Sequence, residues 1–172
     1  MKLVRVDQDQ FHFELGQEEQ IYLYHLLFQY PLVPAGYQAI SRQREAKTLV
    51  ENQQLLEETL QERRVANRKQ IVELLNQQGR FQTDEEGKIV KVTFTRGEIE
   101  WLLQICNDIR IGSWLALGSP ELDERNLLYQ DPAKVRYVIN IEIAGQFEVH
   151  FIHALDGGGN SGSEDETTNP VE

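Results

Sequence analysis

Apolar and polar residues alternate along two short stretches at the start of the chain, residues 2–6 (KLVRV) and 11–15 (FHFEL). Both are rich in β-branched or aromatic residues, which is typical of strands with one buried face. The polar run between them, residues 7–10 (DQDQ), predicts a hairpin loop. A helix is predicted next, over residues 17–30, and Pro31 ends it because proline cannot continue a helix. Its apolar residues gather on one side, namely Ile21, Leu23, Tyr24, Leu27 and Phe28.

The same order of elements recurs in the middle of the chain. Residues 84–87 (DEEG) predict a turn, and a strand follows through Phe94. Thr95 and Glu98 then form the capping-box pattern that begins a helix, predicted over residues 96–117.

These two units share a layout in which a cap residue follows a strand and a glutamate comes three positions later. The cap and the glutamate are Gly16 and Glu19 in the first unit, and Thr95 and Glu98 in the second. An aromatic residue and a leucine follow in both. Two such units can pair their strands in one small sheet and bury both helices on one face.

Residues 41–79 contain no internal glycine or proline and predict a long helix, capped by Ser41 and ended by Gly79. A single helix of that length would span about 58 Å. Its apolar residues form only a thin stripe: Leu49, Val50, Leu56, Leu60, Ile71, Leu74 and Leu75. Polar residues interrupt that stripe at Arg63, Arg64 and Asn67. The helix therefore either bends there into two packed pieces or projects and needs a partner helix, unless its polar face is simply solvated.

Residues 132–155 allow two interpretations. Isoleucines, phenylalanines and a valine alternate with polar residues there, which favours a β-hairpin. That hairpin would place Glu142 opposite Glu148, which is unfavourable. In a helix, Asp131 is the cap, Pro132 lies in the first turn, and one continuous ridge forms at four-residue spacing. Its members are Val135, Ile139, Ile143, Phe147, Phe151 and Leu155. We predict the helix.

These elements predict one mostly helical α+β domain over residues 1–155, with a small three-stranded antiparallel sheet packed by helices and one long helix or helical pair. The last 17 residues contain five acidic residues, no basic ones and little to bury, so we expect a disordered acidic tail at 156–172 that is dispensable for folding.

Charge and composition limit the cellular compartment and the classes of binding partner that we expect. The formal net charge is −11, which disfavours binding to nucleic acid or to anionic membranes. There is one cysteine, Cys106, and the chain shows neither the apolar core of a signal peptide nor a run long enough to span a bilayer. We expect a cytoplasmic protein.

The helix predicted over 96–117 carries three polar residues in its middle, Asn107, Asp108 and Arg110, with apolar residues on nearly all sides. A buried charge is retained when it is paired and hydrogen-bonded. Asp108 and Arg110 are two positions apart and cannot face each other on a helix, so each needs a partner on another element. We interpret the three as a structural polar network; the alternatives are a functional site or exposure at a partner interface.

No nucleotide-binding or hydrolase motif is present, and the sequence predicts no cofactor. Glu142, His150 and His153 fall on one polar stripe of the predicted 132–155 helix and are the best candidates for a metal site, although a plain polar stripe explains them as well. Cys106 lies on the apolar part of its helix, where a buried small hydrophobe is the default.

The stretch from Gly87 to Leu117 resembles an uncharacterised bacterial family known mainly from actinobacteria. That family has a short strand, a helix with an acidic start and a tryptophan, and then Asn-Asp-Leu-Arg-Leu followed by glycine. The matching positions here are Trp101, Asn107, Asp108, Arg110 and Gly112, with isoleucines at 109 and 111. After the arginine this chain reads Ile-Gly-Ser-Trp where the family has Leu-Gly-Thr.

Residues 11–27 are similar to the family's first strand and helix. The family's last segment is helical, and this resemblance is a reason for predicting a helix over residues 132–155, where local propensity favours strands. Its gene often neighbours that of the adaptor for the Clp protease. The resemblance therefore implies a bacterial cytoplasmic protein linked to protein turnover or regulation, and it implies no activity.

Taken together, these features favour a non-catalytic regulatory or adaptor protein. It would act through protein contacts of the 41–79 helix, and it could also form homo-oligomers. The alternative is a metal-dependent enzyme that uses Glu142, His150 and His153.

Overall fold

Four antiparallel strands pair in the order β1-β2-β4-β3 in the part of the chain that the computed structural model describes, residues 1–32, 47–120, 129 and 131–157. The strands are β1 (Lys2–Asp7), β2 (Gln10–Gly16), β3 (Phe81–Thr83) and β4 (Ile89–Thr95). The sequence predicted three strands, and the sheet contains a fourth, β3. Three residues are too few to show an alternating pattern, and β3 exists because it pairs with β4.

Both hairpins turn at the polar runs that the sequence marks. The first has two residues between its strands, and Gln8 takes a positive φ of 54°. In the second, the carboxylate of Asp84 accepts hydrogen bonds from the backbone N–H of Lys88 (2.7 Å) and Ile89 (3.2 Å). Gly87 supplies the positive φ, 72°, that this turn needs.

Helices α1 (Gln17–Phe28) and α3 (Arg96–Ala116) begin directly after β2 and β4, as predicted. The Thr95 hydroxyl accepts from the Glu98 N–H (3.2 Å), and the Glu98 carboxylate accepts from the Thr95 N–H (2.8 Å). At the first helix Glu19 likewise accepts from the Gly16 N–H (2.8 Å), although glycine has no side chain to complete the box. The strands that precede these helices, β2 and β4, pair antiparallel with each other. The two helices therefore start from opposite ends of one sheet.

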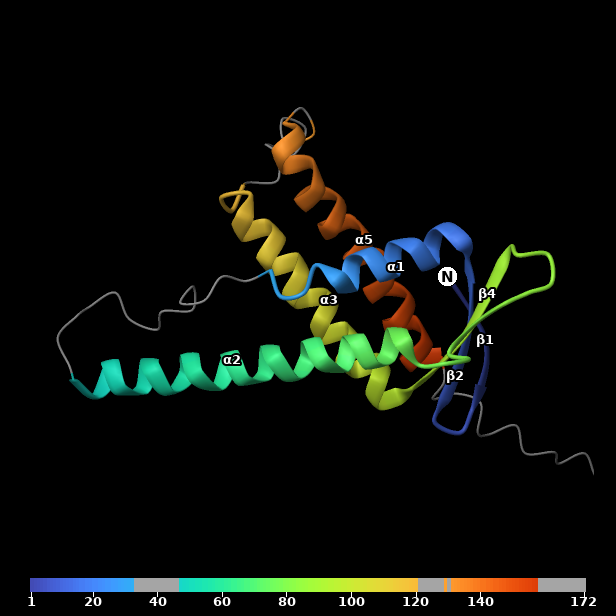
Figure 1. Ribbon diagram of the computed structural model, residues 1–172, viewed down its shortest axis with the longest axis horizontal. Coiled ribbons are helices and arrows are strands. Elements are labelled where there is room, and N and C mark those ends of the chain that lie inside the picture. The colour runs from blue at the N-terminus through green and yellow to red at the C-terminus, as the bar shows by residue number, and fades with distance from the viewer. Residues whose placement is uncertain (33–46, 121–128, 130, 158–172) are drawn as a thin grey trace, which may run out of the picture.

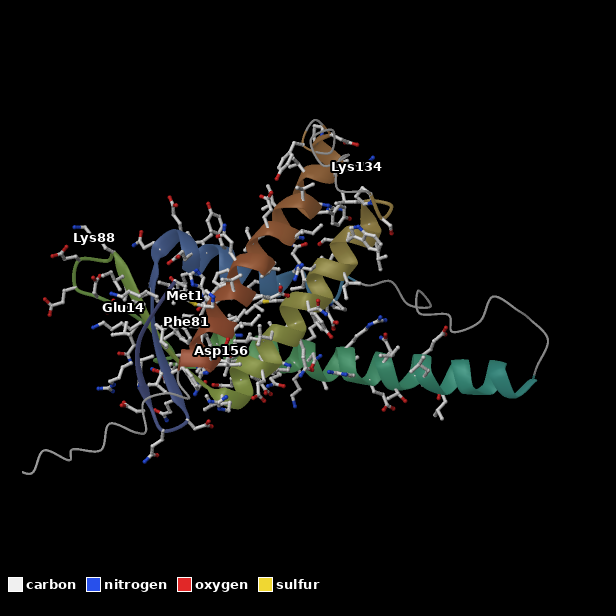
Figure 2. The ribbon with its side chains drawn as sticks, turned by 180° about the vertical axis from the view of Figure 1, so that it is seen from behind. Met1, Glu14, Phe81, Lys88, Lys134 and Asp156 are labelled. Atoms are coloured by element: carbon white, nitrogen blue, oxygen red, sulfur yellow. The ribbon has the colours of Figure 1, made fainter. Side chains whose placement is uncertain are left out.

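The last stretch is helical, α5 (Pro132–Gly157), and the hairpin interpretation is excluded. The Asp131 carboxylate accepts from the Ala133 N–H (3.0 Å) and caps the helix. Figure 2 places Lys134 at the far tip of the molecule and Asp156 beside the sheet, so α5 runs back along α3 to the sheet. The predicted ridge is partly wrong, because Ile139 is exposed and Ala144 is buried instead.

The core lies between one face of the sheet and the helices, which all stand on that side (Figure 1). Alternate residues of the central strands point into it: Phe11, Phe13 and Leu15 from β2, and Val90, Val92 and Phe94 from β4. Phe151 of α5 reaches the sheet, with its ring centroid 6.1 Å from that of Phe13 and 6.0 Å from that of Phe94. Phe147 stacks on Phe151 one turn earlier, at 6.3 Å.

The long helix is one unbroken element, α2 (Lys47–Asn76), about 45 Å long. It ends three residues before the predicted Gly79, and residues 41–46 of the prediction lie outside the described residues. Ile71, Leu74 and Leu75 join the core, whereas the other end extends well beyond the rest of the molecule (Figure 1). We call residues 47–62 the α2 arm; its side chains are described from Leu55 onward.

The predicted acidic tail lies outside the described residues, except that Asp156 and Gly157 still belong to α5. Within the described part of the chain, none of the helices combines the length and the apolar character needed to cross a bilayer.

Phe151→Ala should lower the free energy of unfolding by about 3–5 kcal/mol, because it opens a cavity among three other phenylalanine rings. Ile152→Ala is the control, since Ile152 neighbours Phe151 but its side chain is 46% exposed; it should cost less than about 1 kcal/mol. Denaturant titration of both variants checks this. Similar losses in the two variants would show that α5 does not pack on the sheet through Phe151.

Candidate functional site

The three polar residues in the middle of α3 do not meet one another. Asp108 faces α2, Arg110 faces α5, and Asn107 is exposed on the ridge between them. Successive residues of a helix are about 100° apart, so neighbours in the sequence point in different directions. The three residues thus lie along two neighbouring hollows, and Asn107 lines both.

Arg110 has a carboxylate partner on another element, as the sequence argument required. Its Nη1 donates to Oε2 of Glu148 on α5, and the two form an ion pair. The Arg110 side chain is 43% exposed, whereas that of Glu148 is only 11% exposed. The buried member of the pair is therefore the glutamate, and the arginine keeps much of its contact with water.

The hollow beside Arg110 lies between the tips of α3 and α5 and has a volume of about 220 Å³. Its walls are mostly apolar and include Ile111, Trp114 and Ile141. Ile111 and Trp114 are both well exposed, and the Trp114 indole N–H donates to the carbonyl of Pro120 (3.3 Å).

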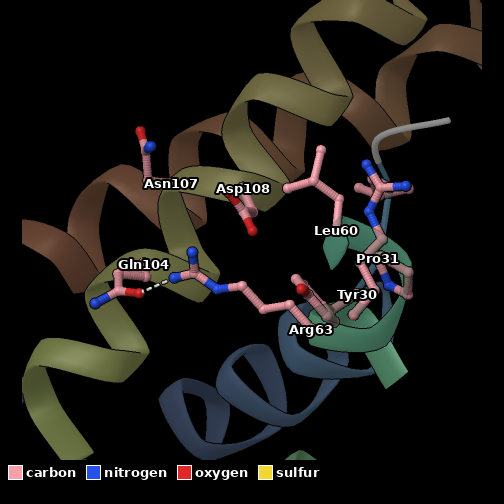
Figure 3. Close-up of a pocket in the computed structure, with 9 residues that line it drawn as sticks. Tyr30, Pro31, Leu60, Arg63, Gln104, Asn107 and Asp108 are labelled. Carbon is pink, nitrogen blue, oxygen red and sulfur yellow. Dashed lines mark hydrogen bonds between the residues drawn. The ribbon is translucent and has the colours of Figure 1, made fainter. Parts of the chain in front are cut away.

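Asp108 lines a second hollow of about 220 Å³, the Asp108 pocket, where the C-terminal end of α1, α2 and α3 meet. Figure 3 shows its carboxylate directed into the pocket, beside Leu60 and Arg63 of α2, whereas Asn107 points away from the centre. The Arg63 guanidinium donates to the side-chain oxygen of Gln104. Arg64 is the second arginine on the wall.

Burial raises the pKa of Asp108 above its ordinary value of 3.8, and the charges of Arg63 and Arg64 offset only part of that effect. Within the described residues, no hydrogen bond or ion pair reaches this carboxylate. The walls of the pocket thus carry one half-buried carboxylate and two arginines that are not joined to it by a hydrogen bond or ion pair within the described residues.

A chain of hydrogen bonds joins α2 and α3 to Tyr30, which also lines the pocket. The indole N–H of Trp101 donates to Asn67 Oδ1 (3.1 Å), and Asn67 Nδ2 donates to the hydroxyl of Tyr30 (3.0 Å). Arg68 adds a bond from Nη1 to the carbonyl oxygen of Tyr30 (2.6 Å). In the sequence, Asn67 stands out only as a polar residue that interrupts the apolar stripe of residues 41–79. That interruption is the sequence signal for its place in this chain of hydrogen bonds.

The three candidate metal ligands are not brought together. Glu142 and His153 are eleven residues apart on α5, which separates them by about 16 Å along the helix axis. Glu142 instead accepts a hydrogen bond from the hydroxyl of Tyr129. In the described ranges, no three residues among His, Cys, Asp and Glu gather closely enough to hold a metal ion.

Cys106 is fully buried, and its burial raises the pKa of the thiol to about 12. A thiol that stays protonated at physiological pH is a poor nucleophile.

Comparison of the chain with protein-family models, with curated proteins and with solved structures finds no match to any of them. The resemblance of residues 87–117 to a bacterial family therefore stays a prediction.

Arg110→Met should lower the free energy of unfolding by about 1–3 kcal/mol, because Glu148 is left nearly buried without its donor. The loss should stay below the 3–5 kcal/mol typical of a fully buried pair, since Arg110 itself is 43% exposed. Adding Glu148→Gln should recover part of the loss, as measured by urea melts of the four proteins in the cycle. Lys134→Met breaks an exposed pair on α5 and is the control. A loss no larger than the control would contradict a structural role for Arg110.

Asp108→Asn should raise the melting temperature at pH 7 by up to about 2 °C. A carboxyl whose pKa is raised on folding holds its proton more tightly in the folded state, so its ionised form lowers stability at neutral pH. That loss disappears below the ordinary pKa of 3.8, and the difference between the proteins should shrink as the pH falls towards it. Thermal melts at several pH values check this, with Glu100→Gln, an exposed carboxyl on the same helix, as control. A lower melting temperature at pH 7 would mean that Asp108 is a stabilising partner of the arginines.

Proposed function

We propose that this chain is a cytoplasmic, non-catalytic regulatory or adaptor protein that binds another protein through the α2 arm. The observation that carries the proposal is the contrast between the two ends of α2. Ile71 and Leu75 are buried in the core, whereas Leu55 is 64% exposed on a stretch that extends beyond the other helices (Figure 1).

Physical considerations support a partner for this arm. A helical stretch of about sixteen residues is only marginally stable in water unless an apolar face is packed. Leu56 and Leu60 are one turn apart and fall on the same face as Asn67 and Ile71, so the face that packs on the core continues outward. An apolar stripe of this kind is the usual anchor of a helix that docks in a groove or on another helix.

Charge indicates the chemistry of the partner. Residues 47–62 carry four glutamates and one lysine, a net charge of −3. Residues 63–76 carry four basic residues and one glutamate, a net charge of +3. The arm therefore suits a partner with basic groups beside an apolar groove, because complementary charge speeds association and excludes wrong partners. The basic half of a second copy of this chain also has that property, so a homo-oligomer is one form of the proposal.

A photo-reactive residue at Leu55 tests the proposal in cells of the source organism. We expect a discrete cross-linked adduct, and it should weaken strongly in the Glu58→Lys/Glu62→Lys variant, which removes the negative charge of the arm. An adduct of twice the 20.0 kDa chain would identify a second copy.

The matched control carries the same probe at Val149, which is half exposed and belongs to another helix, α5. Equal labelling from both positions would contradict docking through α2. An adduct of equal yield in the wild type and in the Glu58→Lys/Glu62→Lys variant would contradict it as well.

A further inference from the structure

The Asp108 pocket combines three charges that do not satisfy one another. Arg64 and Asp108 are both half-buried, and within the described residues neither takes part in a hydrogen bond or an ion pair. Arg63 is held by an uncharged partner, Gln104, rather than by the carboxylate across the pocket. Half-buried charges normally find compensation, because removing them from water costs free energy. In this pocket Arg63 and Arg64 compensate the charge of Asp108 only in part, because within the described residues no hydrogen bond or ion pair joins them to its carboxylate.

The charges define what an occupant must carry. A guanidinium has five N–H donors in a planar fork that matches a carboxylate, and Arg63 uses one of its nitrogens for Gln104. Two arginines can therefore grip two carboxylates, or two ends of a small dianion. Asp108 would repel a ligand that brings only negative charge, so the occupant needs an ammonium group for this carboxylate. Charge balance then requires two anionic groups and one cationic group.

Size and polarity limit the occupant further. The pocket volume of about 220 Å³ is below the range of about 300–1,000 Å³ that holds drug-sized ligands. Leu60 and Pro31 supply an apolar side against which a short methylene chain can pack (Figure 3).

We propose that the Asp108 pocket binds a small amino dicarboxylate, with Arg63 and Arg64 holding its carboxylates and Asp108 holding its ammonium group. Free acidic amino acids belong to this chemical class. The proposal goes beyond the docking of the arm and does not depend on it, and the two share one residue, Leu60, which belongs to the arm and lines the pocket. Arg63 lies one turn from Asn67 towards the arm and already bonds Gln104 of α3, so an occupant would add a further link between α2 and α3 at that turn.

Isothermal titration calorimetry of the full chain tests the proposal with matched probes at millimolar concentration. L-Glutamate and L-aspartate carry all three groups, glutarate lacks only the ammonium, and inorganic phosphate is a plain anion. We expect binding of at least one of the two amino acids, at least about tenfold tighter than that of glutarate or phosphate.

Two variants assign the groups. Asp108→Asn should remove the preference for the amino acid over glutarate and leave glutarate binding unchanged or stronger. Arg64→Gln should weaken both about tenfold or more. Lys69→Gln is the control, because it makes the same charge change on an exposed residue of the same helix and should alter neither. Circular dichroism spectra show that each variant is folded.

Each other outcome overturns the proposal. The absence of heat and of any thermal shift with both amino acids in the wild-type protein would exclude the ligand class. Equal binding of glutarate, phosphate and glutamate would make the pocket a plain anion site. Full retention of binding in both Asp108→Asn and Arg64→Gln would place the ligand elsewhere on the molecule.

Discussion

The position of α2 depends on one buried amide. Asn67 lies with only 9% of its surface exposed, and both ends of its side-chain amide are bonded, one to the Trp101 indole and one to the Tyr30 hydroxyl. A buried amide that loses a partner costs about 1–3 kcal/mol, so sliding or rotating α2 would cost both bonds at once. This constraint fixes where the helix joins the body. It thereby also fixes which residues line the Asp108 pocket and where the arm begins.

The elements with strong local signals were predictable from the sequence, and those held by distant contacts were not. Thr95 and Glu98 act within one turn of helix, and the start of α3 follows from them. Helix α5 is a mixed case, because Asp131 and Pro132 are suited to a helix start but the β-branched residues that follow favour strands, and the prediction of a helix also depended on the family resemblance. Strand β3 has no local signal, because its three residues are set by pairing with β4.

In the candidate site, too, some features were predictable from local sequence and others depend on distant contacts. Helix geometry alone required Asp108 and Arg110 to face different elements, and this requirement is met. The identity of the partner could not be derived, because Glu148 is 38 positions from Arg110 and only the packing of α5 on α3 brings them together. The environment of Asp108 was equally hidden. Its arginines come from α2, whose placement depends on Tyr30 and Trp101.

Two irregularities in the hydrophobic pattern, far apart in the sequence, meet at one place in the structure. The first is the polar interruption of the α2 stripe at Arg63, Arg64 and Asn67, and the second is the polar residues in the middle of α3. A sequence specifies its fold when pattern, packing and polar satisfaction agree, and departures from that agreement are expected where function imposes another demand. Asn67 is explained by structure, since every polar atom of its side-chain amide has a partner. Arg64 and Asp108 have no such explanation within the described residues, because packing alone would be served better by apolar side chains. These two incompletely paired charges therefore mark the base of the arm as the place where the proposed ligand would bind.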